Sequence, residues 1–147
     1  MSLKEKLLEA MKTAMRDKDV LKKNAIQMAR SAVLQVEKDT KVTLDDDGVV
    51  EVIAKEVKKR RDSIQEYEKA GRQDVIDNLQ KEIDSLTIYL PEQLTEEELE
   101  DIVKQTVQEL SVTSSKEIGK VMQGIMPKVK GRADGRIVNQ IVKKILI

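Results

Sequence analysis

Residues 116–147, KEIGKVMQGIMPKVKGRADGRIVNQIVKKILI, decide the fold of the C-terminal part of the chain. Two rows of apolar residues flank a basic, glycine-containing segment, and within each row the apolar side chains recur at intervals of three and four. That spacing is typical of one face of an α-helix. The first row is Ile118, Val121, Met122, Ile125, Met126 and Val129, and the second is Ile137, Val138, Ile141, Val142, Ile145 and Leu146. The stretch therefore predicts a helix, a tight basic corner and a second helix.

The corner, residues 128–136 or KVKGRADGR, carries the signals that end one helix and start the next. Gly131 can take the backbone shape that commonly ends a helix. The carboxylate of Asp134 can accept hydrogen bonds from the backbone N–H groups left free in the first turn of a helix. We therefore expect Gly131 to end the first helix and Asp134 to cap the second.

The composition favours amphipathic helices over disorder, because apolar residues make up 39% of the chain and are periodic rather than sparse. The chain has no cysteine, which excludes a disulfide framework, a thiolate metal site and a cysteine nucleophile. It has no histidine either, which removes the commonest general base and the commonest metal ligand. Its 147 residues suffice for one domain or two small ones.

The start of the chain predicts a mature helix rather than a signal sequence, because Glu5 and Glu9 interrupt its apolar row. No run approaches the roughly 18 apolar residues of a membrane span. We therefore expect a cytoplasmic protein without a membrane partner.

Charge is unevenly distributed along a chain whose net charge is zero. Residues 1–90 are balanced, residues 91–112 carry one lysine against seven acids, and residues 116–147 carry eight basic residues against two acids. A local excess of positive charge can attract a polyanion even when the whole protein is neutral.

The chain in order predicts an all-α protein with four helices before Pro91 and three after it. The four helices are expected at about residues 2–17, 20–37, 48–70 and 74–89. Pro91 disfavours a helical conformation at the preceding residue and cannot donate a backbone hydrogen bond. Thr95 then caps a fifth helix, and Ser114 or Ser115 caps a sixth. We therefore predict an N-terminal helical domain at residues 1–90 and a three-helix domain at residues 91–147.

Candidate catalytic and metal sites are weak. The acidic run before Gly48, residues 45–47, does not have the spacing of a calcium loop and better suits the start of a helix. Residues 114–116, Ser-Ser-Lys, contain both residue types of a Ser-Lys amidase but no segment that builds an oxyanion hole. Residues 58–61 are four consecutive bases, which on a helix point around its whole circumference. No phosphate-binding loop motif is present. We expect no catalytic residue, metal or cofactor.

The C-terminal stretch resembles the hallmark of the GatB/YqeY family, which is also found in the tail domain of the B subunit of the tRNA-dependent amidotransferase. The residues that carry this resemblance are 119–124 (GKVMQG), 127–135 (PKVKGRADG) and 138–142 (VNQIV). The rest of the chain is similar to the stand-alone YqeY-like members, through residues 59–64 (KRRDSI), 70–72 (AGR) and 89–94 (YLPEQL). The resemblance covers essentially the whole chain.

This resemblance implies binding to tRNA, because the tail domain of the larger enzyme is understood to contact the tRNA body. The residues expected to bind RNA lie on or near the basic corner: Lys120, Lys128, Lys130, Gly131, Arg132, Gly135, Arg136, Lys143 and Lys144. Positioned cations suffice for phosphate contacts, and glycine lets the backbone approach a phosphate closely. With two tyrosines as the only aromatics, stacking on single-stranded bases is disfavoured, and folded RNA fits better.

The kinship also carries the label of a carbon–nitrogen ligase that uses glutamine as amido donor, and with it a role in translation. The chain resembles only the tail of that enzyme, not its amidase subunit or its ATP-using catalytic domain. An accessory protein, with an amidotransferase or an aminoacyl-tRNA synthetase as a further partner, is therefore expected rather than an independent enzyme. Two alternatives remain open: an adaptor that docks a protein partner through the acidic fifth helix or an apolar face, and an amidotransferase-type enzyme.

Overall fold

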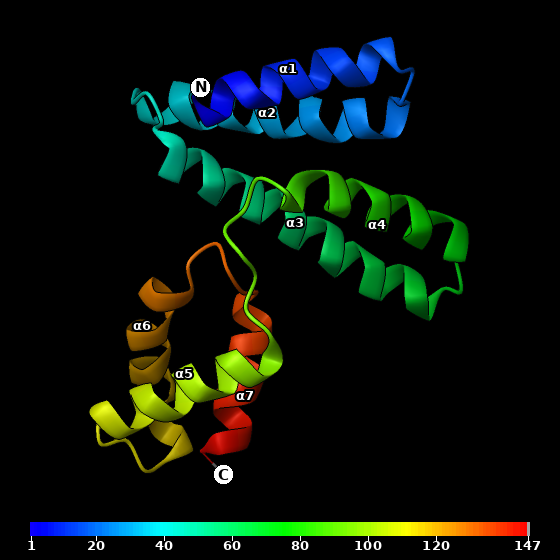
Figure 1. The fold of residues 1–147 in the computed structure, drawn as a ribbon. Helices are drawn as coiled ribbons and strands as arrows, with labels where there is room; N and C mark the ends of the chain where they lie inside the picture. The colour runs from blue at the N-terminus through cyan, green and yellow to red at the C-terminus, as the bar shows by residue number, and fades with distance from the viewer. Residues whose placement is uncertain (147) are drawn as a thin grey trace. The chain divides into compact units, whose positions relative to one another are not determined.

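The computed structural model describes residues 1–146, which contain helices and no strand, so the all-α prediction is confirmed (Figure 1). Ile147, the last residue of the predicted second domain, lies outside the described residues. The helices are α1 (Leu3–Arg16), α2 (Val20–Thr40), α3 (Asp46–Lys69), α4 (Gln73–Thr87), α5 (Glu96–Glu109), the short 3-10 helix η1 (Ser115–Glu117), α6 (Ile118–Val129) and α7 (Gly135–Ile145).

The chain divides into two compact units, Met1–Leu90 and Pro91–Ile147, and each has its own apolar core. In the first unit, α1 packs on α2 and α3 packs on α4, and the pairs share one core. Its fully buried large side chains include Leu7, Ile26, Val49, Ile53, Val57 and Leu86. In the second unit, α5, α6 and α7 contact one another around a core that includes Val103, Val121, Ile125, Val129, Val138 and Val142.

Short polar side chains cap α1 and α5, and the cap of α5 lies at Thr95 as the sequence predicts. The Ser2 hydroxyl accepts from the Glu5 N–H at 3.2 Å, and the Glu5 carboxylate accepts from the Ser2 N–H in return. This reciprocal pair is a capping box. The Thr95 hydroxyl accepts from the Glu98 N–H at 3.2 Å and caps α5. Each cap satisfies a backbone donor that the first turn of a helix leaves unpaired.

The acidic run before Gly48 starts α3, as its composition predicts. The Asp45 carboxylate accepts from the Gly48 N–H at 2.9 Å and caps the helix. Asp46 accepts from the Leu3 N–H at 2.9 Å, so it ties the start of α1 to the start of α3. Within residues 1–146 no group of three or more acidic side chains is arranged to hold a metal ion. The hydrogen bonds of Asp45 and Asp46 lie at the starts of α3 and α1.

The basic run at residues 58–61 contributes a buried charge to the first unit. Arg60 is 6% exposed, and its guanidinium donates to the backbone carbonyl and the carboxylate of Glu56 at 2.9 and 3.1 Å. The carboxylate of Glu82 on α4 lies 3.9 Å from its Nε atom. The four basic side chains point in different directions around the helix, and that of Arg60 points toward the core.

Glu37 holds the start of α1 and the loop after α2 together. Its carboxylate accepts from the Lys4 ammonium and from the Leu44 N–H, the latter at 2.7 Å. The hydrogen bond from Lys4, followed by that from Leu44, holds the pKa of the Glu37 carboxyl below its usual range. Both bonds stabilise the charged carboxylate, so they weaken when Glu37 is protonated.

We predict that Arg60→Ala lowers the free energy of unfolding of the first unit by about 3 kcal/mol, because it removes the buried cation from Glu56 and leaves that carboxylate with only the exposed ammonium of Lys59, 3.3 Å away. Both tyrosines lie in the first unit, so tyrosine fluorescence during urea unfolding measures this change. Lys55→Ala on the exposed side of α3 is the matched control and should change stability by less than about 0.5 kcal/mol. Equal losses in the two variants would contradict the assignment.

We predict that Glu37 makes the first unit more stable above about pH 5 than below it. Its pKa is lower in the folded chain than in the unfolded chain. Its contribution is therefore present above the unfolded pKa and is lost as pH falls through the folded pKa. In urea unfolding followed from about pH 6 to about pH 3, Glu37→Gln should show a shallower loss of stability than the unmodified protein. Parallel pH profiles would refute this.

Candidate functional site

The basic corner joins α6 to α7 through a left-handed residue. The helix α6 ends at Val129, and Lys130 leaves it with φ −53° and ψ 122°. Gly131 then has φ +74°, a conformation in which a Cβ atom is strained. The Arg132 N–H donates to the Val129 carbonyl at 2.8 Å and closes the turn. The prediction that Gly131 ends the first helix is confirmed.

The start of α7 is capped as the sequence predicts. The Asp134 carboxylate accepts from the Arg136 N–H at 2.9 Å, and the helix begins at Gly135. A Cβ atom on Gly135 would meet the Met126 side chain no closer than 3.7 Å, which is an ordinary contact. Of the two corner glycines, Gly131 is thus the one that the backbone requires.

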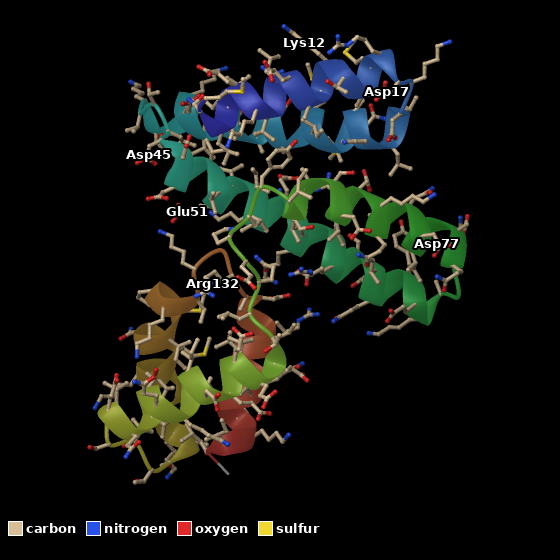
Figure 2. All side chains as sticks on the ribbon, viewed as in Figure 1. Lys12, Asp17, Asp45, Glu51, Asp77 and Arg132 are labelled. Carbon is tan, nitrogen blue, oxygen red and sulfur yellow. The ribbon has the colours of Figure 1, made fainter. Side chains whose placement is uncertain are left out.

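The segment before α5 is hydrogen-bonded to the corner. The Gln93 amide nitrogen donates to the carbonyls of Gly131 and Pro91 at 2.8 and 2.9 Å. The Arg132 Nε donates to the Glu92 carbonyl at 3.1 Å, and the Leu94 N–H donates to the Arg132 carbonyl at 2.9 Å. We call these four hydrogen bonds the clasp; Figure 2 labels Arg132 where the chain enters α7. The clasp fixes the corner to residues about forty positions earlier.

The structure separates the nine predicted RNA-binding residues into two groups. Six lie at the corner: Lys128, Lys130, Gly131, Arg132, Gly135 and Arg136. Lys120 lies in the first turn of α6, and Lys143 and Lys144 lie in the last turn of α7. These three lysines do not lie near the corner, because α7 has 11 residues and its ends are roughly 16 Å apart. Since α6 and α7 run antiparallel, the three lysines share the opposite end of this helix pair (Figure 1).

One of the predicted cations is already paired within the second unit. The Lys128 ammonium lies 3.1 Å from the Glu109 carboxylate and donates to the Thr106 hydroxyl at 3.0 Å. A Cβ atom on Gly124, one turn earlier in α6, would meet Leu110 and Thr106 at 3.2 Å. This close approach of α6 to α5 places Lys128 beside Glu109, so the acidic helix reduces the charge available at the corner.

The three lysines at the far end keep their charge exposed. Lys120, Lys143 and Lys144 are exposed, and none of them forms an ion pair with residues 1–146. Arg132 at the corner is half-buried and uses its Nε in the clasp. The pair α6–α7 therefore carries cations at both ends.

Two apolar residues of the predicted helix rows face outward. Met126 and Ile137 are 39% and 37% exposed, whereas their rows predict them to be inside. They lie in the last turn of α6 and the first turn of α7, on either side of the corner. Gln93 was not predicted from the sequence, because its role depends on a contact across about forty residues. The tight turn predicted at Gly131 is the local sequence feature that indicates where this contact lies.

Of the two serines before α6, Ser114 caps the short helix η1. The Ser114 hydroxyl accepts from the Lys116 N–H at 3.2 Å and caps η1, after which α6 begins. The prediction that Ser114 or Ser115 caps the sixth helix is therefore wrong for α6, whose N-cap residue is Glu117 and makes no capping hydrogen bond with its side chain. No contact between the Ser114 hydroxyl and a lysine ammonium, as Ser-Lys chemistry needs, is found within residues 1–146.

Comparison with known proteins assigns the family. The family model described as "Yqey-like protein" matches residues 4–146. The chain belongs to the YqeY-like family. A mitochondrial protein of Pyrenophora tritici-repentis, named Altered inheritance of mitochondria protein 41, is 29% identical over 139 residues, which are 92% of this chain and 76% of that protein. An uncharacterized protein of Schizosaccharomyces pombe is 32% identical over 90 residues, 61% of this chain and 70% of that protein.

Within residues 1–146 of this YqeY-like protein, no helix is both long enough and apolar enough to cross a membrane. The relative from Pyrenophora tritici-repentis carries "mitochondrial" in its name. Location of this chain in the cytoplasm stays a prediction.

We predict that glycine-to-alanine substitutions in α6 and in the turn that follows it have opposite effects on the stability of the second unit. Gly131→Ala should lower the free energy of unfolding of the second unit by about 1 kcal/mol, because alanine is strained at φ +74°. Gly119→Ala should stabilise it by up to about 1 kcal/mol, because Gly119 is helical and a Cβ atom there meets nothing within 4 Å. Thermal unfolding followed by circular dichroism measures both. A neutral Gly131→Ala would contradict the requirement for glycine.

Proposed function

We propose that this YqeY-like protein binds the phosphate backbone of folded RNA, with tRNA as the ligand, through the helix pair α6–α7. In this proposal it acts as an accessory in tRNA-dependent amidation and does not catalyse the reaction by itself. The resemblance of residues 119–142 to the tail of the amidotransferase B subunit motivates the choice of tRNA.

The observation that carries the proposal is the charge of the α6–α7 pair. Residues 116–147 hold eight basic residues and two acids. Of the two acids, Asp134 is engaged in capping α7. Lys120, Lys143 and Lys144 are exposed without an ion pair to residues 1–146. Unpaired cations on a rigid helix pair are what phosphate binding needs, since phosphate contacts supply most of the affinity for nucleic acids.

The expected mode is recognition of shape and backbone. Both tyrosines lie in the first unit, so the α6–α7 pair offers no aromatic side chain on which a base could stack. An A-form helix presents regularly spaced phosphates, and cations roughly 16 Å apart at the two ends of α7 can reach different phosphates. The proposed ligand is therefore a folded RNA rather than a single strand.

We predict that the triple variant K120A/K143A/K144A, which removes the three exposed lysines that form no ion pair within residues 1–146, flattens the salt dependence of tRNA binding. Each phosphate contact contributes about −0.7 to −0.9 to the log–log slope, so loss of three contacts should flatten it by about 2 to 3. Filter binding of bulk tRNA over a salt series measures the slope. The control, K6A/K12A/K38A, removes three exposed lysines from the first unit and the same total charge.

Equal slopes for the two triple variants would mean that binding follows net charge and not this surface. Absence of tRNA binding by the unmodified protein at low salt would refute the proposal. If a pull-down then recovered a protein partner through the acidic helix α5, the adaptor alternative would replace it. Release of ammonia from glutamine by the pure protein would instead favour the enzyme.

A further inference from the structure

Two sequence motifs that lie far apart in the chain meet in the clasp. Residues 89–94 (YLPEQL) follow α4, and residues 127–135 (PKVKGRADG) end α6. Three hydrogen bonds join the first motif to Gly131 and Arg132 of the second, and the fourth, within the first motif, holds the Gln93 amide in place. Neither motif alone predicts this contact.

The clasp leaves one end of the Arg132 side chain fixed and the other available. Its Nε atom donates to the Glu92 carbonyl at 3.1 Å, while no hydrogen bond or ion pair joins its two terminal nitrogens to another residue in 1–146. The planar guanidinium presents donors in a fixed fork that matches phosphate oxygens. With Nε held, the orientation of the remaining donors is set before a ligand arrives.

We propose that Gln93 is a positioning residue for phosphate binding by Arg132. This inference rests on the proposed function, because it assumes that the corner meets RNA. The Gln93 amide has two donors, and both are used: one holds the Pro91 carbonyl and one holds the Gly131 carbonyl. Gln93 therefore fixes the backbone of Glu92 relative to the turn that contains Arg132. The Glu92 carbonyl is the group that accepts the hydrogen bond from the Arg132 Nε.

A pre-organised side chain binds more tightly because less conformational freedom is lost when the ligand binds. Gln93 is uncharged, so its removal leaves the net charge and the number of phosphate contacts unchanged. The proposal thus separates positioning from charge. If charge alone decides affinity, Gln93 is irrelevant; if the orientation of Arg132 matters, loss of Gln93 weakens binding.

The test is a double-mutant cycle of Gln93→Ala and Arg132→Ala, with bulk tRNA as the probe. Gln93→Ala should weaken binding about 5-fold, or about 1 kcal/mol, with little change in the salt slope. In the Arg132→Ala background it should have almost no further effect, because the two residues act through one contact. Gln105→Ala, an exposed glutamine on α5, is the matched control and should leave affinity unchanged. Circular dichroism checks that each variant keeps its helices.

A second measurement uses the unmodified protein. The Leu94 N–H donates to the Arg132 carbonyl, so tRNA should slow its hydrogen exchange if binding favours the clasped corner. Three results would overturn the inference while the proposed function stands: normal affinity in Gln93→Ala, an equal loss of affinity in both backgrounds, or unchanged exchange at Leu94 when tRNA is bound. Failure of the unmodified protein to bind tRNA would overturn both.

Discussion

The geometry of the second unit depends on the left-handed backbone of Gly131. Its φ of +74° lets the chain reverse between α6 and α7 within a few residues, so that Val129 and Val138 can lie in the same core. The same reversal turns the carbonyls of Gly131 and Arg132 toward residues 93 and 94, which donate hydrogen bonds to them. One dihedral angle thus supports the packing of the helices and the position of the basic corner.

In the second unit, acidic side chains are concentrated on α5 and basic side chains on the pair α6–α7. The acidic helix α5 and the basic pair α6–α7 share a core, yet Lys128–Glu109 is the ion pair found between them within residues 1–146. That pair is exposed, and such pairs contribute little to stability. This ion pair therefore adds little to the stability of the unit, and the exposed Lys120, Lys143 and Lys144 form no ion pair within residues 1–146. A polyanion that approaches α6–α7 is attracted by these helices and repelled by α5, so its orientation is restricted.

Local features were predictable from the sequence, and long-range ones were not. The caps at Thr95 and Asp134 and the turn at Gly131 involve residues within a few positions of one another, and the structure has them as expected. The burial of Arg60 depends on Glu82 from another helix, and a run of four bases gives no sign of which one faces inward. At the candidate site, the nine cationic and glycine positions stay a prediction from the sequence, and their division into two ends required the helix bounds. The pairing of Lys128 required the approach of α5.

The clasp has a consequence for where this chain can be divided. The first helix of the second unit is α5. Its cap is the Thr95 side chain, which accepts from the Glu98 N–H and involves no residue before Thr95. A fragment cut there would contain the residues of α5, α6 and α7 but would lose the carbonyl of Glu92, the amide of Gln93 and the N–H of Leu94, which bind the corner. The four residues that look like a tether between the units are thus an integral part of the second one.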